Sequence, residues 1–502
     1  MVLLFARRHN RHCAGVRRQG TSGGWKGAGN MAGKGGLKIV FVGGGSLRIL
    51  PIVRGILHRH PAALDGGAIR LVDRVVSRAE TVGRLLDRIP ERKNATFDIS
   101  WSSDIERALD GADVLYVTMA VGRTDLFLKA QKVCMQNGFI ASDQISPTGA
   151  FLALTAGPTI LRFARLMEKS CPTARMLIYA NPVAVYSGMV GNHTKVSALG
   201  LCGGFANHRY DLTRILTGRD GYSEEYDVDV AGVNHLSFII RGRHRGRDLY
   251  ELIAAACRKP FRRIALPRER PAMRTHINYG LIKLREMHRR FGYIIYSTEG
   301  DGMAHLFHEE MYERSMAKWA PPSPEAVCDA ERSSQRNREK MQQEYESYVG
   351  KDLDARFWAK MDREGHRLWG RNTADVTLLA LKGLAGLGRE KLVGSRPHRG
   401  AVDGFPERAV LEFSQFADRD GFHAAPGLFV PPCFHGLIAA LSMHQTLLGD
   451  AIAAGDPKIL ADALFAYPIH QNTRASRRMF RRLVRIFGPQ IPDVFQKTVD
   501  YL

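Results

Sequence analysis

A glycine loop near the start of the chain constrains its fold more than any other feature. Leu37 to Val42 is a short run rich in β-branched residues, and the loop with Gly43, Gly45 and Ser46 follows it directly. Apolar residues then recur at helical spacing up to Leu57. A strand, a glycine turn and a helix in this order let backbone N–H groups and the helix N-terminus hold a pyrophosphate. The segment therefore predicts a dinucleotide-binding α/β unit, with Gly43, Gly45 and Ser46 at the cofactor.

The end of the next strand-like segment bears on which dinucleotide binds. Residues 69–73 end in Asp73, and a carboxylate there can accept both hydroxyls of the adenosine ribose. This favours NAD over its 2′-phosphorylated relative, although Arg74 beside it leaves the preference open. Arg48 stands where the third glycine of the fingerprint is expected, so a plain turn is the alternative interpretation of the loop.

Strands and helices continue to alternate over the first 200 residues, which is typical of a doubly wound parallel sheet. The polar segment 142–149 is expected to be a loop before a long helix. After residue 236 the sequence is helix-rich, with apolar residues at helical spacing in segments such as 434–444. Further strands are expected at 97–101, 113–119, 175–180, 196–201 and 228–233, and helices at 104–109 and 151–167.

These patterns divide the chain into three parts. Residues 1–36 contain seven Lys or Arg and no acid, and we expect a disordered basic tail there. Residues 37–200 are expected to form a Rossmann-like domain that binds NAD. Residues 201–502 are expected to form a helix-rich α+β domain, similar in type to that of lactate and malate dehydrogenases, for metal, substrate and oligomer contacts.

Composition excludes several classes of protein. The net charge is +22, but the tail contributes seven of these charges and the rest are spread out, so we expect no nucleic-acid partner. No apolar run reaches the ~18 residues that a membrane-spanning helix needs, so we expect no membrane contact. The seven cysteines are odd in number and scattered, which favours reduced thiols and a cytoplasmic protein.

Two residues at strand ends suggest a metal site. Cys202 and His235 each follow a strand-like run. A thiolate and an imidazole at neighbouring strand ends can share one divalent cation and leave its other positions to substrate oxygens and water. Both residue types are also common as ordinary buried residues, and His193 and His208 are alternative ligands.

Asn181 lies at a third strand end. It follows the strand expected at 175–180, and Pro182 directly after it ends the ladder. Ligands bind at the carboxyl edge of such sheets, so Asn181 is a candidate for contact with the substrate. An ordinary turn asparagine is the alternative.

Taken together, these segments resemble the family 4 glycoside hydrolases, which use NAD and a divalent metal, typically manganese. The resemblance covers roughly residues 37 to 490. Its most specific motifs are those around Cys202 and His235, because the glycine loop is shared with many dehydrogenases. The matching segments are 38–46, 71–73, 181–182, 200–203, 231–235 and 460–468.

The resemblance implies a mechanism. NAD takes a hydride from C3 of the sugar, the metal polarises the resulting ketone, and a base removes the proton at C2. The C1–O bond then breaks by elimination, water adds to the alkene, and the hydride returns to C3. This differs from the two-carboxylate route of most glycosidases.

Site residues follow from the same resemblance. Cys202 and His235 would bind the metal, and Asn181 and Asn234 would contact the sugar. Asp301 in the Gly300-Asp301 pair best matches the family's loop, so Asp301 is predicted as the base, with Tyr296 close by as a second catalytic residue. The other candidates for the base are Tyr279, Tyr293, Tyr296 itself, Glu299 and His305.

Two departures from the family pattern concern substrate handling. Gly203 stands where members that cleave α-linkages often have a polar residue, and Thr155 stands near a usual arginine. The sugar is therefore left open, with a non-phosphorylated or carboxylated one slightly favoured, and a homodimer or homotetramer is expected. The alternative functions are an NAD-dependent dehydrogenase of the lactate/malate or sugar type and a catalytically silent NAD-binding protein.

Overall fold

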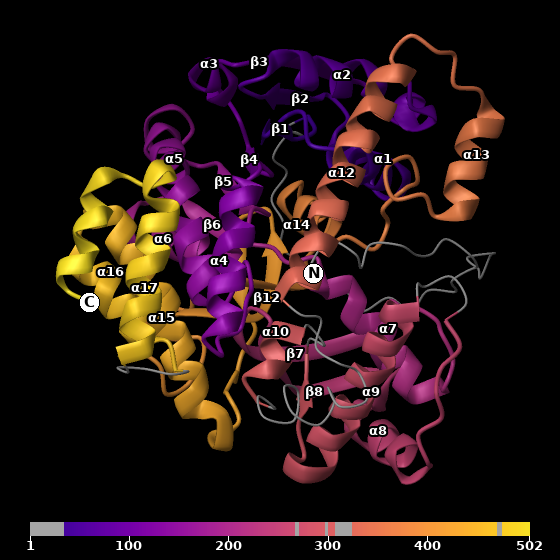
Figure 1. Cartoon of the computed structure of the whole chain (residues 1–502). Helices are drawn as coiled ribbons and strands as arrows, with labels where there is room; N and C mark the ends of the chain where they lie inside the picture. The colour runs from indigo at the N-terminus through magenta and orange to yellow at the C-terminus, as the bar shows by residue number, and fades with distance from the viewer. Residues whose placement is uncertain (1–34, 267–270, 297–299, 307–323, 469–473) are drawn as a thin grey trace.

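The computed structural model describes residues 35–266, 271–296, 300–306, 324–468 and 474–502 (Figure 1). Nearly all of the basic tail expected at 1–36 lies outside these residues, as do Glu299 and Cys13. The six cysteines that the structure describes are all free thiols.

The first part of the chain forms the predicted Rossmann-like sheet. Its strands lie in the order β3-β2-β1-β4-β5-β6 and are all parallel, which is the order of dinucleotide-binding folds. Their β-branched and apolar residues are buried on both faces, as parallel sheets require. The strands are β1 (Lys38–Val42), β2 (Gly67–Val72), β3 (Phe97–Ser102), β4 (Val114–Val117), β5 (Arg175–Ile178) and β6 (Ser197–Gly200).

Helices cover both faces of this sheet. The long helix α5 begins four residues before its expected start, because the Ser146 hydroxyl caps it by accepting from the backbone N–H of Thr148 at 3.2 Å. Pro147 fits the first helical position, so the polar loop is shorter than expected. The helices are α1 (Ile49–Arg59), α2 (Val76–Leu86), α3 (Ile105–Leu109), α4 (Thr124–Gln136), α5 (Pro147–Ser170) and α6 (Val183–His193).

The second part of the chain extends the same sheet. Strands β10-β8-β7-β12-β11 continue from β6 as antiparallel neighbours, and the two parts join where Ser395 of β11 pairs with Gly200 of β6. The sheet is thus continuous across the boundary expected at residue 200. The strands are β7 (Tyr226–Val233), β8 (Leu236–His244), β9 (Arg247–Asp248), β10 (Ile294–Ile295), β11 (Glu390–Pro397), β12 (Val410–Asp418) and β13 (Gly421–Ala424).

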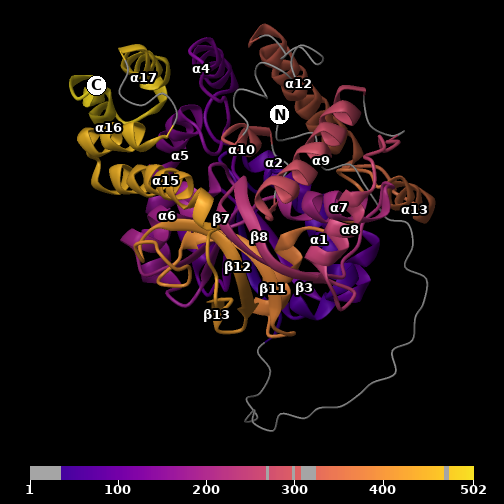
Figure 2. The same ribbon diagram turned by 90° about the horizontal axis from the view of Figure 1, so that it is seen from below.

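Six of the remaining helices form two groups that lie apart from each other. Figure 2 shows α15, α16 and α17 beside α5 and α6, away from α7, α8 and α9. This agrees with the fold class expected from the sequence. The helices are α7 (Gly204–Thr217), α8 (Leu249–Arg258), α9 (Pro271–Phe291), α10 (Gly300–Ala304), α12 (Pro324–Tyr348), α13 (Ala355–Glu364), α14 (Val376–Leu384), α15 (His435–Ala454), α16 (Pro457–Ala466) and α17 (Arg474–Phe487).

Two described helical segments, Pro147–Ser170 and Pro432–Ala454, are long and apolar enough to cross a bilayer by length and composition alone. Most of each is buried inside the protein, as in the core helices of globular domains. Both pack against α6, which lies beside β6.

Candidate functional site

The glycine loop is packed too tightly for any side chain. A Cβ added at Gly43 would lie 2.7 Å from the backbone of Met119, and one at Gly45 would lie 2.4 Å from the Cβ of Arg78. Gly43 also has a φ of +81°, which favours glycine. Ser46 follows the loop, and its hydroxyl lies 3.2 Å from that of Thr118 at the end of β4. Because Gly43 and Gly45 have no side chains, the backbone of the loop itself forms the cavity wall at the start of α1.

Asp73 lies where β2 ends, as predicted, and its carboxylate contacts the glycine loop. Oδ2 accepts from the N–H of Gly45 at 3.0 Å, and Oδ1 accepts from the N–H of Val75 at 3.0 Å. Arg78 from α2 lines the same region. These contacts fix the carboxylate at the carboxyl edge of the sheet, where a ribose binds in this fold.

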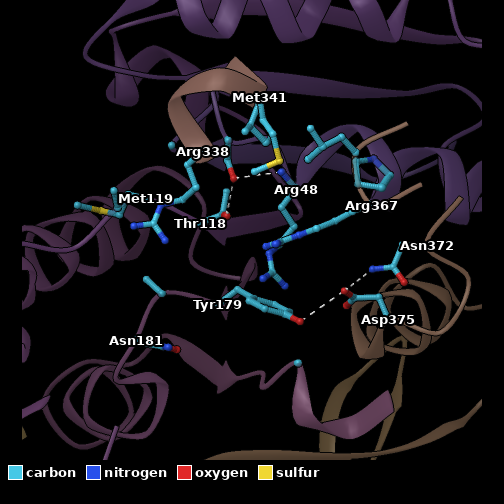
Figure 3. A pocket seen from close by; sticks show the side chains of 18 of the residues that line it. Arg48, Thr118, Met119, Tyr179, Asn181, Arg338, Met341, Arg367, Asn372 and Asp375 are labelled. Carbon is cyan, nitrogen blue, oxygen red and sulfur yellow. Dashed lines mark hydrogen bonds between the residues drawn. The ribbon is translucent and has the colours of Figure 1, made fainter. Parts of the chain in front are cut away.

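One cavity of about 780 Å³ joins the glycine loop to the predicted metal residue Cys202 (Figure 3). Its walls come from the carboxyl ends of the parallel strands, from the start of α7, from α12 and from residues 365–376. Gly43, Gly45, Ser46, Asp73, Asn181 and Cys202, all predicted from the sequence, line it. A cavity of this size at the switch point of an α/β sheet is the usual ligand site of such folds.

The structure brings the predicted metal ligands together. Cys202 follows β6 and precedes α7, whose Gly204 N–H donates to the Cys202 sulfur at 3.4 Å. His235 lies in the two-residue turn between β7 and β8, with a φ of +70°. Its Nε2 is 3.6 Å from the Cys202 Sγ. The side chains, 33 residues apart in sequence, thus meet at the edge of the cavity, which Cys202 lines and behind which His235 is buried.

This donor pair fits a divalent cation. The 3.6 Å separation of the sulfur and the nitrogen is short enough for both atoms to reach one cation. Among the residues that the structure describes, no cluster of three or more His, Cys, Asp or Glu forms a closed ion site. A cation held by Cys202 and His235 would keep positions open to a substrate, as catalytic sites do.

Asp301 lies behind the imidazole of His235. Both carboxylate oxygens are 2.9 Å from the His235 Nδ1, and the Ser142 hydroxyl donates to one of them. Burial raises the pKa of Asp301, but His235 and the Ser142 hydrogen bond outweigh it and hold the pKa well below its usual value. A Cβ at Gly302 would collide with the carbonyl of His235, so the glycine allows this approach. A carboxylate in this position orients a metal-binding imidazole.

Asp143 is a site residue that the sequence analysis missed. It lines the cavity, and its Oδ2 accepts from the amide of Asn181 at 2.8 Å. Its Oδ1 is buried with no hydrogen-bond partner among the described residues. Burial raises the pKa of Asp143, although Asn181 opposes this. The polar composition of 142–149 marked the segment, but only the contact with Asn181 singles out this carboxyl group.

Asn234 and Tyr296 are not among the described residues that line the cavity. The Asn234 amide donates to Glu412 at 2.7 Å, and the Ser237 hydroxyl donates to the other oxygen of Glu412 at 2.7 Å. Tyr296 is buried against His208, with ring centroids 4.3 Å apart, and burial raises its pKa well above the usual value. These two residues therefore support the turn and the base of α7.

The other sequence candidates lie elsewhere. His193 pairs with Asp450 at 2.7 Å, and His305 bridges the backbone carbonyl of Asp301 and the hydroxyl of Tyr467. Thr155 donates back to the Leu152 carbonyl within α5. Among the described residues that line the cavity there is no Tyr279 or Tyr293.

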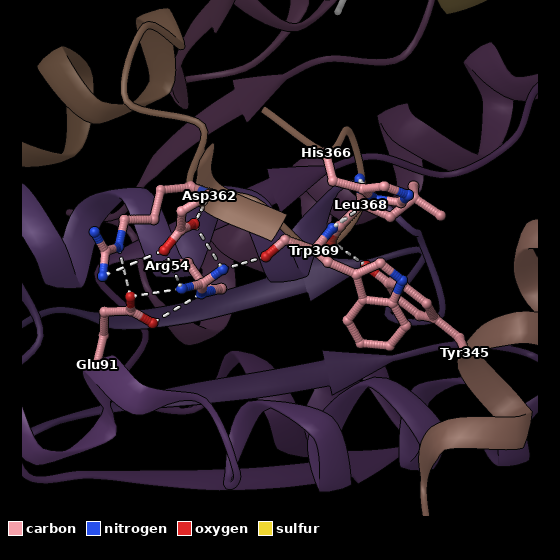
Figure 4. Close-up of polar contacts among 8 residues, drawn as sticks. Arg54, Glu91, Tyr345, Asp362, His366, Leu368 and Trp369 are labelled. Carbon is pink, nitrogen blue, oxygen red and sulfur yellow. Dashed lines mark hydrogen bonds and ion pairs between the residues drawn. The ribbon is translucent and has the colours of Figure 1, made fainter. Parts of the chain in front are cut away.

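A buried charge network holds the wall formed by residues 365–376 (Figure 4). Arg54 of α1 is fully buried and donates to both oxygens of Glu91 and both of Asp362, and it also bonds the carbonyl of Trp369. Arg371 donates to Glu91 at 2.6 Å and pairs with Asp362 at 3.4 Å. The network ties the cavity wall to the first helix of the nucleotide-binding part.

Two family models match the chain. The family 4 glycosyl hydrolase model matches residues 38–217, and the model of the family 4 glycosyl hydrolase C-terminal domain matches residues 230–469. The chain is 25% identical to an alpha-galactosidase of Rhizobium meliloti over 82% of its length and 81% of that protein. It is 29% identical to an alpha-galactosidase of Bacillus subtilis, but there the match covers 42% of the chain and about half (49%) of the relative.

Solved structures share the fold. A 6-phospho-alpha-glucosidase from gut microorganisms, in complex with NAD and Mn²⁺, has a TM-score of 0.72 at 16% identity, covering 91% of this chain and 99% of that one. A 6-phospho-beta glucosidase from Thermotoga maritima, with manganese, NAD⁺ and glucose-6-phosphate, has a TM-score of 0.69 at 15% identity with the same coverage.

Proposed function

Because the chain belongs to the family 4 glycosyl hydrolases, we propose that it is a glycosidase that requires NAD and a divalent cation, first of all Mn²⁺. The observation that carries this proposal is the 3.6 Å approach of His235 to Cys202, which lines the same cavity as the glycine loop. A dehydrogenase of the lactate/malate type needs the loop but no metal held by a thiol and an imidazole.

NAD fits the nucleotide half of the cavity. The close packing of Gly43 and Gly45 leaves room for a pyrophosphate at the start of α1, and Asp73 is held where a ribose would lie. When bound, NAD would supply the hydride acceptor and donor for C3 of the sugar, and the cation would supply a Lewis acid for the ketone at C3. Cys202 and His235 are the residues proposed to hold that cation.

The chain's own side chains then position the sugar and move a proton. Asn181 lines the cavity and is oriented by Asp143, so its amide is proposed to bind a sugar hydroxyl. Asp143 is the cavity carboxyl group with a raised pKa, which suits a base that takes the C2 proton. Asp301, the base predicted from the sequence, is proposed to orient His235 instead, since both its oxygens lie against Nδ1.

The test is hydrolysis of a panel of aryl glycosides, neutral, carboxylated and 6-phosphorylated, by the full-length protein. Release of the aryl group that depends on added NAD and on Mn²⁺, and stops with a chelator, is the expected result. Turnover that survives removal of both would contradict the proposal. Net accumulation of NADH with a hydroxy acid or free sugar would point to a dehydrogenase, and tight NAD binding without any turnover to a silent binding protein.

A further inference from the structure

The hydroxyl of Tyr179 lies beside the residue that follows the metal-binding cysteine. Tyr179 follows β5 and lines the cavity together with Asn181, Cys202 and Gly203 (Figure 3). A Cβ added at Gly203 would lie 3.0 Å from the Tyr179 hydroxyl oxygen. The phenol oxygen therefore limits the space for a side chain at position 203, and it lies beside the residue that follows Cys202.

Two charged residues flank this phenol. The guanidinium of Arg48 lies 4.0 Å from the centre of the Tyr179 ring. On the other side, the Tyr179 hydroxyl donates to Asp375 at 3.4 Å, a long hydrogen bond. Asp375 is itself held by the Asn372 amide at 3.0 Å and the Thr377 N–H at 2.9 Å, so its position is fixed. The arginine at the expected third-glycine position thus places a positive charge against the face of this tyrosine.

The surroundings keep the hydroxyl protonated, and its long hydrogen bond to Asp375 is the one that a leaving-group oxygen would replace. Burial raises the pKa of Tyr179 well above its usual value, while Arg48 acts in the opposite direction. A neutral phenol is therefore present at neutral pH, and Arg48 is in place to stabilise a tyrosinate once a proton has left. General acids positioned in this way contribute about 10²–10⁴-fold to a rate.

We propose that Tyr179 is the proton donor to the leaving group of the glycoside, with Arg48 as the residue that stabilises its anion. This inference rests on the proposed glycosidase function. When the C1–O bond breaks, its electron pair goes to the leaving oxygen, which takes the Tyr179 proton and departs as an alcohol. The water that then adds at C1 gives its hydroxide to carbon and its proton to the tyrosinate, which restores the phenol.

The experiment compares Tyr179→Phe with Tyr116→Phe on two glycosides of the same sugar, one 4-nitrophenyl and one methyl. Tyr116 is a matched control because its buried hydroxyl bonds Thr377, its ring stacks on Tyr179, and it is not on the cavity wall. We expect Tyr179→Phe to lower turnover of the methyl glycoside about 10²-fold and that of the nitrophenyl glycoside less than threefold, since nitrophenolate leaves without a proton. The control should change both rates equally.

A second readout separates proton donation from folding. In D₂O, the methyl glycoside recovered unhydrolysed from Tyr179→Phe should carry deuterium at C2, because the earlier proton transfer still occurs while the C1–O bond breaks slowly. Arg48→Gln should shift the ratio of the two rates in the same direction, about tenfold.

Equal losses on both glycosides, or loss of C2 exchange together with hydrolysis, would overturn the role of Tyr179. An unchanged rate ratio in Arg48→Gln would remove Arg48 from the proposal. A wild-type protein that cleaves neither glycoside, nor any on the panel, would instead refute the glycosidase function on which the inference rests.

Discussion

Two buried groups of charged and polar side chains lie close to the same cavity, and they differ in how completely their members are paired. In the network around Arg54, both oxygens of Glu91 and of Asp362 accept from arginine, and Arg54 has three separate partners. In the pair of Cys202 and His235, the sulfur and Nε2 contact each other at 3.6 Å. Asp301 holds the far side of the imidazole, and the sulfur accepts one long bond from the Gly204 N–H.

The difference separates two uses of buried polarity. A network whose donors and acceptors are all matched adds rigidity, and removal of one member leaves an uncompensated buried charge. A pair with remaining capacity on its cavity side can take up a cation and a substrate. We therefore expect changes in the first group to affect chiefly stability, and changes in the second to affect chiefly activity.

The largest expected effect is on turnover, from Cys202→Ser. Loss of the thiol should lower glycoside turnover by about 10³-fold, because the cation contributes several kcal/mol of charge stabilisation in the transition state. Stability without metal should change by less than about 1 kcal/mol, since the side chain is half-buried at the cavity. Activity and stability are measured by glycoside turnover and by thermal unfolding, each with and without Mn²⁺. A variant that unfolds readily but keeps its turnover would contradict the assignment of Cys202 to activity and not to stability.

Glu91→Ala, in contrast, should affect chiefly the stability of the protein. It leaves Arg54, which is fully buried, without one of its two carboxylates, and removal of one member of a buried pair costs about 3–5 kcal/mol. The free energy of unfolding from denaturant titration is the measurement. Glu80→Ala is the matched control, because its ion pair with Arg84 is solvent-exposed and should contribute less than about 0.5 kcal/mol. Equal losses in the two variants would contradict the proposed stabilising role of the network.

Asp143→Asn sharpens the assignment of the base within the cavity. We expect a loss of about 10²-fold in turnover with unchanged affinity for Mn²⁺, because the carboxyl group takes a proton and does not hold the cation. Metal titration followed by thermal shift, together with steady-state kinetics, separates the two quantities. Turnover close to that of the wild type would exclude Asp143 as the base and favour Asp301, the residue predicted from the sequence.

Asp301→Asn is expected to have the smallest effect, about tenfold, and to act through the metal. Partners that orient a metal-binding imidazole typically contribute 10–100-fold to metal affinity or activity. The amide can still bond Nδ1, so affinity for Mn²⁺ should fall and saturating Mn²⁺ should restore most of the turnover. Loss of turnover that excess Mn²⁺ does not restore would assign Asp301 to the chemistry and not to positioning.

Features that depend on local sequence patterns could be predicted from the sequence. The β-branched run before Gly43 and the alternation of strands and helices led to the Rossmann-like sheet, and two strand ends led to Cys202 and His235. Periodicity did not reveal β11 and β12, which extend the same sheet more than 190 residues later in the chain. Their pairing is a tertiary event that no local pattern encodes.

Contacts between residues far apart in the chain also could not be predicted from the sequence. Arg54 and Asp362 are 308 residues apart, and Asp143 acquires its importance only through Asn181, which β5 brings to the same cavity. Tyr179 and Gly203 are complementary in shape, a relation that appears only when both strand ends are in place. Tertiary packing also sets the directions of the Asn234 and Tyr296 side chains, so the sequence did not reveal them.

The central claim is that the glycine loop and the Cys202–His235 pair act on one sugar in one cavity. The most direct test is hydrolysis of an accepted glycoside in D₂O with NAD and Mn²⁺, followed by location of deuterium in the released sugar. The account predicts one deuterium at C2, and no release of sugar when either NAD or Mn²⁺ is withheld. Hydrolysis that leaves C2 fully protonated and proceeds without NAD would contradict it.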